Sequence, residues 1–180
     1  MAESLPSSPT SRHFILDREI LHNFLASARL ATYIAEKPSK LRIGPFRVLG
    51  HFDAALDLVY TDTYYASDDD TVLRGTEFVL RPGSPGGLRI NYSGGFQPTN
   101  GCPLSAREVL DQILKPCRRD ALSGSRKEQE GKIGDNKYRY RWTVMGSVEQ
   151  EVITAWFDGQ WSTVHQIIFK EDSGKMFPTG

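Results

Sequence analysis

Residues Asp62 to Asn91 read DTYYASDDDTVLRGTEFVLRPGSPGGLRIN, and this stretch decides the expected fold class. Tyrosine and β-branched residues over 59–65, 76–81 and 88–92 predict strands, because such side chains pack well on a pleated surface. Asp68, Asp69 and Asp70 repel one another and bond locally to the backbone, so they predict a solvated turn after the first strand. The PGSPGG segment at 82–87 predicts the next turn. The stretch therefore favours an antiparallel sheet.

The remaining sequence adds helices and further strands. Apolar residues at helical spacing predict a helix over 17–35 with Asp17 as its cap, and the capping box of Ser105 and Glu108 predicts another helix over 105–114. Further strands are expected at 41–52, 138–145, 149–157 and 161–170. With about seven or eight mostly antiparallel strands and two or three flanking helices, the expected class is α+β, with the strands forming a β-barrel or tunnel.

The domain organisation follows from length and composition. A chain of 180 residues with 39% hydrophobic residues can form one domain with its own core. Residues 1–11 are rich in Ser, Thr and Pro and poor in hydrophobic residues, so they predict a flexible N-terminal tail before a single domain at 12–180. The segment 118–137 is almost purely polar, which predicts an exposed, mobile loop.

Charge and cysteine content bear on partners and location. The chain has 22 basic and 22 acidic residues, so no overall field favours nucleic acid or an anionic membrane, and neither is expected as a partner. Cys102 and Cys117, together with the lack of an apolar leader segment, favour free thiols and a cytoplasmic location. The oligomeric state stays open.

A DTYY strand that leads through a short turn to a strand ending in Leu80-Arg81, and then to a hairpin partner, resembles the CYTH superfamily of triphosphate tunnel enzymes. In that family, glutamates of a Glu-x-Glu-x-Lys strand hold a divalent metal inside the tunnel. The corresponding strand should lie near Ser11 to Phe14, which contains no glutamate, and Asn91 stands where the family has a lysine. The resemblance therefore implies the tunnel fold, while these departures predict that it works without a metal or another cofactor.

Two acidic pairs keep a metal site open as an alternative. Glu128 and Glu130 belong to a literal Glu-x-Glu-x-Lys motif, but this motif lies in the polar 118–137 segment. Glu149 and Glu151 begin a convincing strand, where residues at i and i+2 share one face and can bind one cation. Whether that face points into the tunnel cannot be decided from the sequence.

A tunnel with arginines and aromatic residues would suit an organic ligand that has one anionic or carbonyl group. The residues predicted to bind it are Tyr64, Arg81, Arg89, Asn91, Arg139, Trp142 and Trp156. Of these, Arg139 and Trp142 also resemble an arginine and tryptophan pair of the CYTH family. His165 is the predicted acid or base, because burial in a strand and a nearby Asp158 could place its pKa near neutral. Arg81, Asp158 and His165 are thus the predicted catalytic residues.

Three functions remain in competition. The first is a metal-independent enzyme that promotes an isomerisation, cyclisation or rearrangement of a small, secondary-metabolite-like molecule. The second is a metal-dependent phosphohydrolase acting on thiamine triphosphate or tripolyphosphate, which would use one of the acidic pairs. The third is a small-molecule binding protein without catalytic activity.

Overall fold

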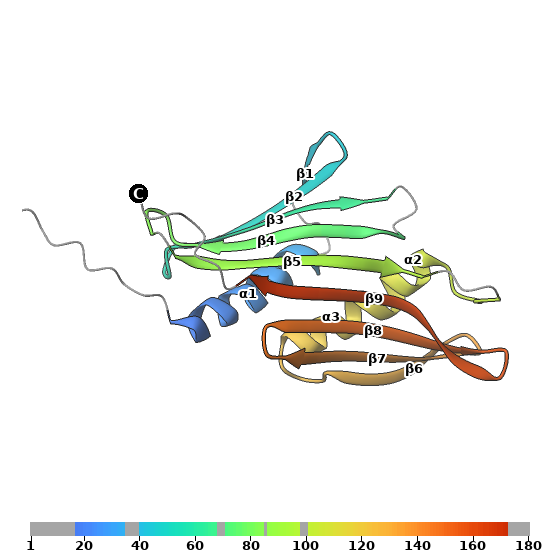
Figure 1. Ribbon diagram of the computed structural model, residues 1–180. Helices are drawn as coiled ribbons and strands as arrows, with labels where there is room; N and C mark the ends of the chain where they lie inside the picture. The colour runs from blue at the N-terminus through green and yellow to red at the C-terminus, as the bar shows by residue number, and fades with distance from the viewer. Residues whose placement is uncertain (1–16, 35–39, 68–70, 85, 98–100, 173–180) are drawn as a thin grey trace, which may run out of the picture.

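In the described part of the chain, nine antiparallel strands form one sheet, and helices pack against one of its faces, here termed the inner face (Figure 1). This computed structural model describes residues 17–34, 40–67, 71–84, 86–97 and 101–172. The helices are α1 (Arg18–Tyr33), α2 (Ala106–Glu108) and α3 (Lys115–Leu122), with the π-helix η1 (Val109–Leu114) between the last two. The strands are β1 (Lys40–Ile43), β2 (Phe46–Asp53), β3 (Leu58–Ala66), β4 (Leu73–Leu80), β5 (Gly87–Phe96), β6 (Glu128–Ile133), β7 (Asn136–Met145), β8 (Val148–Phe157) and β9 (Gln160–Asp172).

The sheet consists of two meanders joined side by side. The strand order is β1-β2-β3-β4-β5-β9-β8-β7-β6, so the first five strands meet the last four at the β5–β9 pair. This confirms the α+β class with an antiparallel sheet. The predicted barrel is wrong in the described part of the chain, because β1 and β6 remain unpaired with each other at the two edges. The helices pack on the inner face, where a closed tunnel would have kept an open lumen.

Strand alternation determines which residues face the helices. In β3, the residues Leu58, Tyr60, Asp62, Tyr64 and Ala66 are all buried and share the inner face. On the neighbouring strand β4, Gly75 lies directly opposite Tyr64. A Cβ atom at position 75 would lie 2.5 Å from Cζ of Tyr92, so glycine is needed to let that ring pack.

Helix α1 confirms the helix predicted over 17–35. The side chain of Asp17 accepts a hydrogen bond from the Glu19 backbone amide, which satisfies a free donor of the first turn. Its buried residues recur at helical spacing and contact the sheet: Leu21, Phe24, Leu25, Ala28, Arg29 and Thr32. An arginine on this otherwise apolar side of the helix requires a partner inside the protein.

The second helical region is longer than predicted. It begins at the predicted capping box of Ser105 and Glu108 but continues through η1 and α3 to Leu122, past the expected end at Pro116. Pro116 lies in the first turn of α3 directly after the π-helical turn, and the widened turn accommodates a residue that has no backbone donor.

The mobile loop predicted for 118–137 is also wrong. Residues 118–122 complete α3, and β6 pairs with β7 as an edge strand whose charged side chains point outward. Charged residues commonly protect edge strands from unwanted pairing. In β6 they leave few apolar residues, so the sequence shows no clear strand alternation. The predicted N-terminal tail, 1–11, lies outside the described residues.

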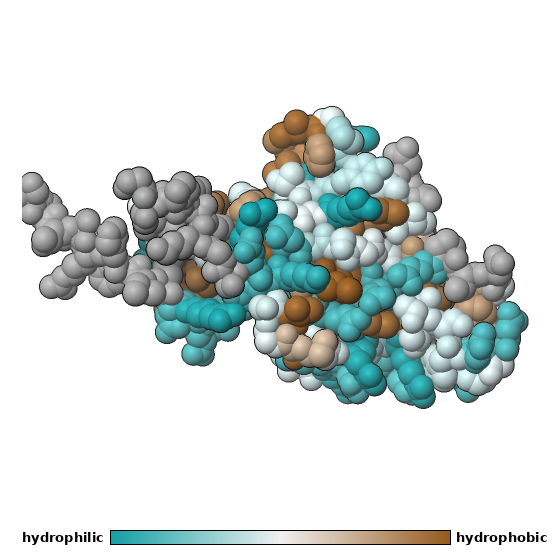
Figure 2. Space-filling view, viewed as in Figure 1, coloured by the Kyte–Doolittle hydropathy of each residue, from teal (hydrophilic) through white to brown (hydrophobic). Residues whose placement is uncertain are grey.

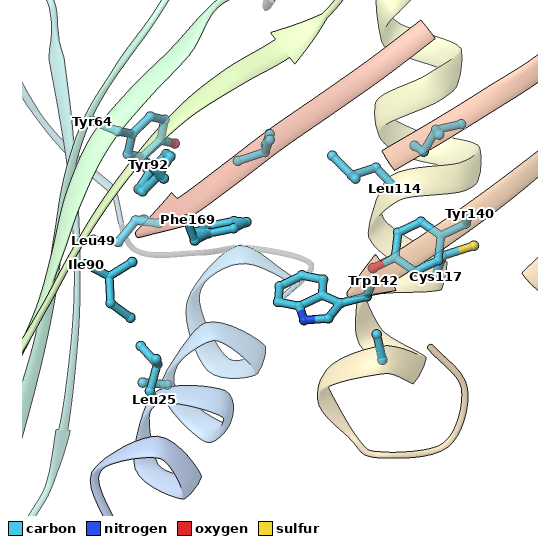
Figure 3. Close-up of a cluster of buried hydrophobic side chains, with 14 of the residues drawn as sticks. Leu25, Leu49, Tyr64, Ile90, Tyr92, Leu114, Cys117, Tyr140, Trp142 and Phe169 are labelled. Atoms are coloured by element: carbon cyan, nitrogen blue, oxygen red, sulfur yellow. The ribbon is translucent and has the colours of Figure 1, made fainter. Parts of the chain in front are cut away.

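The core fills the space between the sheet and the helices. Figure 3 shows Trp142 pointing from β7 into the region between α1 and α3, with Phe169 of β9 beside it. The two rings stack with centroids 5.6 Å apart. Leu25 of α1 and Leu114 at the end of η1 contribute from the helical side. Among the described residues, no helix is both long and apolar enough to cross a membrane.

Candidate functional site

Among the described residues, six acidic or basic side chains are buried on the inner face between apolar core residues. They are Arg29, Asp62, Glu77, Arg118, Glu151 and His165, and they are termed here the inner polar cluster. Burying a charge is costly unless it is paired or hydrogen-bonded. The partners of each member therefore show how the cluster is stabilised and which member is available for chemistry.

Arg29 joins the two meanders through ion pairs. Its guanidinium donates to both carboxylate oxygens of Glu77 on β4, at 2.9 and 2.6 Å, and to Glu149 on β8 at 2.9 Å. The Tyr60 hydroxyl donates to the same Glu77 carboxylate at 2.9 Å. Burial alone would lower the pKa of Arg29, but Glu77 and Glu149 raise it well above its usual value. Arg29 therefore stays ionised, and its ion pairs are a structural element that joins the two meanders.

A second ion pair lies on the other meander. Arg118 of α3 donates twice to the Glu151 carboxylate, and the hydroxyl of Tyr140 donates to it at 2.9 Å. His165 Nε2 lies 4.0 Å from Glu151 and forms no hydrogen bond. Burial lowers the pKa of His165 to about 4, so the imidazole is neutral at neutral pH. The neutral-range pKa expected for His165 is therefore wrong, and its acidic neighbour is Glu151 in place of Asp158.

Asp62 has a different environment from the other carboxylates. It is fully buried and accepts hydrogen bonds from the hydroxyl groups of Tyr33 and Tyr92, the latter at 3.0 and 3.2 Å. The two hydroxyl oxygens are 2.8 Å apart. Burial, reinforced by the nearby Glu77, raises the pKa of Asp62 to about 7 even though the tyrosine hydrogen bonds lower it. Asp62 thus has a pKa near neutrality although it lies in the core.

The two tyrosines are suitable hydrogen-bond donors to Asp62. Burial raises the pKa of both phenols well above the usual value, so both hydroxyls remain protonated at neutral pH. Tyr33 is partly exposed, whereas Tyr92 is buried. The Tyr33 ring also lies 5.7 Å from the Arg118 guanidinium, which places it between the two halves of the inner polar cluster. Tyr33 therefore contacts both the Asp62 and the Arg118 parts of the inner polar cluster.

Three of the residues predicted from the sequence lie on the same face of the sheet as the inner polar cluster. Tyr64, Trp142 and His165 are buried on the inner face. The rings of Tyr64 and Tyr33 have centroids 6.1 Å apart, so Tyr64 borders the Asp62 group. The centre of the Trp142 ring lies 5.8 Å from the guanidinium carbon of Arg29.

The other predicted residues lie on the outer face or in turns. Arg89 forms an exposed ion pair with Asp172 at 3.6 Å. Asn91 accepts a hydrogen bond from Thr76 at 3.0 Å on the outer face. Trp156 of β8 is 40% exposed. These side chains point away from the inner polar cluster because strand alternation assigns them to the opposite face.

Arg139, Arg81 and Asp158 also lie outside the cluster. Arg139 forms an exposed pair with Glu130 at 2.6 Å on the outer face. Arg81 follows β4 and donates to the backbone oxygen of Leu56 at 3.0 Å. Asp158 lies in the β8–β9 turn with a φ of 52°. The predicted combination of Arg81, Asp158 and His165 is therefore not assembled into one site.

The acidic pairs considered as metal ligands are engaged by arginines. Glu149 and Glu151 both point to the inner face, where Arg29 and Arg118 bind them. Glu128 and Glu130 are exposed and pair with Arg141 and Arg139 of β7, with nitrogen–oxygen distances of 3.0 and 2.6 Å, respectively. Within the described ranges, no three His, Cys, Asp or Glu side chains are arranged to hold a metal ion.

Sequence reasoning missed most of the inner polar cluster, although a signal was present. Asp62 alternates with Tyr60 and Tyr64 on one strand, and Glu151 alternates with Ile153 in the same way. A charged residue in the apolar phase of a strand must find a buried partner. That partner lies elsewhere in the chain and could not be identified from the local pattern.

Comparison with known proteins gives no matching family model, no matching curated protein and no matching solved structure. The resemblance to the CYTH superfamily therefore stays a prediction.

Proposed function

We propose that the protein is a metal-independent enzyme that transfers a proton on a small organic molecule and so promotes an isomerisation, cyclisation or rearrangement. The observation that supports it best is the buried Asp62 carboxyl, bound by Tyr33 and Tyr92, with a pKa of about 7. In this proposal Asp62 replaces His165 as the acid or base.

The pKa of Asp62 suits this role. A group whose pKa lies near the working pH is present in both protonation states, so it can both accept and return a proton within one catalytic cycle. Burial is one of the usual ways in which proteins raise a carboxyl pKa into this range. The other cluster carboxylates are bound by guanidinium groups and are less suited to exchanging protons.

Tyr33 and Tyr92 supply the complementary function. Both hydroxyls donate to Asp62 in the structure. When a substrate binds, a hydroxyl that turns from Asp62 to the substrate can donate to a substrate oxygen on which negative charge develops as a neighbouring carbon loses its proton to the carboxylate. Tyr33 is partly exposed, so a substrate would reach the group from its side. Tyr64 next to it offers an apolar surface for the carbon skeleton. A small molecule with an enolisable carbonyl group is the substrate class that fits this arrangement.

The phosphohydrolase alternative fits the contacts of the acidic pairs less well. Triphosphate hydrolysis would need a cation to balance the developing phosphoryl charge. Glu149 and Glu151 would have to release Arg29 and Arg118 before they could bind one. Phosphate release from tripolyphosphate that requires magnesium and is lost in Glu149→Gln would favour the phosphohydrolase over our proposal.

Hydrogen–deuterium exchange at carbon tests the proposal without knowledge of the natural substrate. The protein is incubated in D₂O with a panel of cyclic and aromatic ketones, and NMR follows deuterium entry next to the carbonyl group. We expect exchange above the buffer rate for the wild type and at least a hundredfold loss for Asp62→Asn, within the usual range for removing an acid–base group.

A matched variant tests whether Asp62 or the Asp158 predicted from the sequence takes part in proton transfer. Asp158→Asn removes an aspartate in the β8–β9 turn and should leave the exchange rate unchanged. Exchange that depends on Asp158 and not on Asp62 would refute the role of Asp62. Binding of a ketone without any exchange would instead support a non-catalytic binding protein.

A further inference from the structure

An open groove lies on the outer face of the second meander, opposite the inner polar cluster. Its volume is about 480 Å³, within the range of small-molecule sites. The residues lining it are Glu128, Gln129, Glu130, Arg139, Tyr140, Arg141, Thr143, Gln150, Val152, Thr154 and Trp161. Figure 2 shows mainly hydrophilic and intermediate residues over this part of the molecule, in the region of β6 to β8. We term it the outer groove.

The charges of the outer groove balance. Arg139 pairs with Glu130 at 2.6 Å, and Arg141 pairs with Glu128 at 3.0 Å. An anionic ligand that approaches the arginines therefore also meets two carboxylates, and a cationic ligand meets two guanidinium groups. This arrangement disfavours ligands with a large net charge.

The hydrogen-bonding groups of the groove favour a ligand that both donates and accepts. The guanidinium groups only donate, the carboxylates only accept, and Thr143, Gln150 and Thr154 do both. A sugar hydroxyl can accept from an arginine and donate to its glutamate at the same time. It can therefore bind across each ion pair without separating the two charges.

One end of the outer groove is already rigid. The Arg139 guanidinium lies 4.1 Å from the centre of the Trp161 ring while it also binds Glu130. Trp156 supports Trp161 from the side, with ring centroids 5.6 Å apart. Because Arg139 is held by both contacts, less side-chain freedom is lost when a ligand binds. Val152 offers apolar surface to the C–H face of a sugar ring.

We propose that the outer groove is a binding site for a neutral oligosaccharide. The site is independent of the function proposed for Asp62, since it lies on the other face of the sheet and shares none of the acid–base residues. Its open shape admits a sugar chain that continues beyond the groove on either side.

Isothermal titration calorimetry of the full chain tests this site. The probes are neutral oligosaccharides of glucose, mannose, galactose and N-acetylglucosamine, each titrated to millimolar concentration. We expect at least one probe to bind and Arg139→Ala to weaken its affinity about tenfold, which is the effect of losing charge-assisted hydrogen bonds. Gln150→Ala should weaken it as well, and amide shifts in NMR should lie on β6 to β8.

The control is Arg89→Ala, which removes another outer-face arginine with an exposed ion pair but lies on β5, outside the groove. This variant should bind as the wild type does. The proposal is overturned if none of the four probes binds. It is equally overturned if Arg139→Ala binds unchanged, or if the groove prefers sulfated or phosphorylated sugars over neutral ones.

Discussion

Replacement of Asp62 by asparagine should change how the stability of the protein depends on pH. The pKa of Asp62 is about 7 in the folded protein against an ordinary value of 3.8, so the folded state holds its proton more strongly than the unfolded chain. The resulting contribution to stability is complete below about pH 4 and is lost as the pH rises to about 7. This difference corresponds to about 4 kcal/mol at full extent.

Urea unfolding of wild type and Asp62→Asn, measured at steps between about pH 4 and about pH 8, gives the comparison. Asparagine has nearly the same shape but does not titrate. The free energy of unfolding of the wild type, minus that of the variant, should therefore fall by several kcal/mol across this range. Comparison with the variant is necessary because the buried His165 makes the wild type lose stability in acid, in the opposite direction, and both proteins share this residue.

A difference that stays constant with pH would refute the reasoning. It would mean that Asp62 has an ordinary pKa in the folded protein and is ionised at neutral pH despite its burial. The carboxyl could then not act as the proposed acid or base. A ¹³C NMR titration of the Asp62 carboxyl gives the same pKa directly and should show its midpoint near pH 7.

Three further changes test other contacts of the inner face by urea unfolding. Arg118→Met leaves Glu151 buried without its cation and should lower the free energy of unfolding by about 3–5 kcal/mol, and an unchanged stability would contradict this ion pair. His165→Gln should reduce the loss of stability between pH 6.5 and about 4, because the pKa of His165 is lowered to about 4 in the folded protein. If the variant loses as much stability as the wild type over this pH range, other groups cause the loss. Gly75→Ala places a Cβ 2.5 Å from Tyr92 and should cost about 1–3 kcal/mol, whereas a neutral effect would mean that this ring moves freely.

The sequence predicted the central strands well because their side chains alternate. Residues 59–65 fall within β3, and 149–157 agree closely with β8. The sequence predicts a loop over 118–137, whereas residues 128–133 form the edge strand β6 with charged residues on its outer side. An edge strand buries little apolar surface, so its pattern carries little of the signal on which such predictions depend.

The candidate site was harder to predict than the fold. Arg29 and Glu77 are 48 positions apart, and nothing in either segment identifies the other as its partner. The phase of each strand was also unknown, so Arg139 and Trp156 were expected beside Trp142 although they lie on the opposite face. Asp62 was part of the most informative motif, but only its depth and its two tyrosine partners reveal how its pKa is raised.

The β5–β9 pair has a consequence for how the chain folds. Each meander is made of neighbouring hairpins that can form early, whereas β5 and β9 pair residues that are 69 to 83 positions apart. Closing so long a loop costs chain entropy before any contact is gained, and contacts of this kind slow folding. Arg29 adds to this step, since its charge is fully compensated only when β4 and β8 have both reached it. The joining of the two meanders is thus expected to limit the folding rate and to make the whole sheet unfold as one cooperative unit.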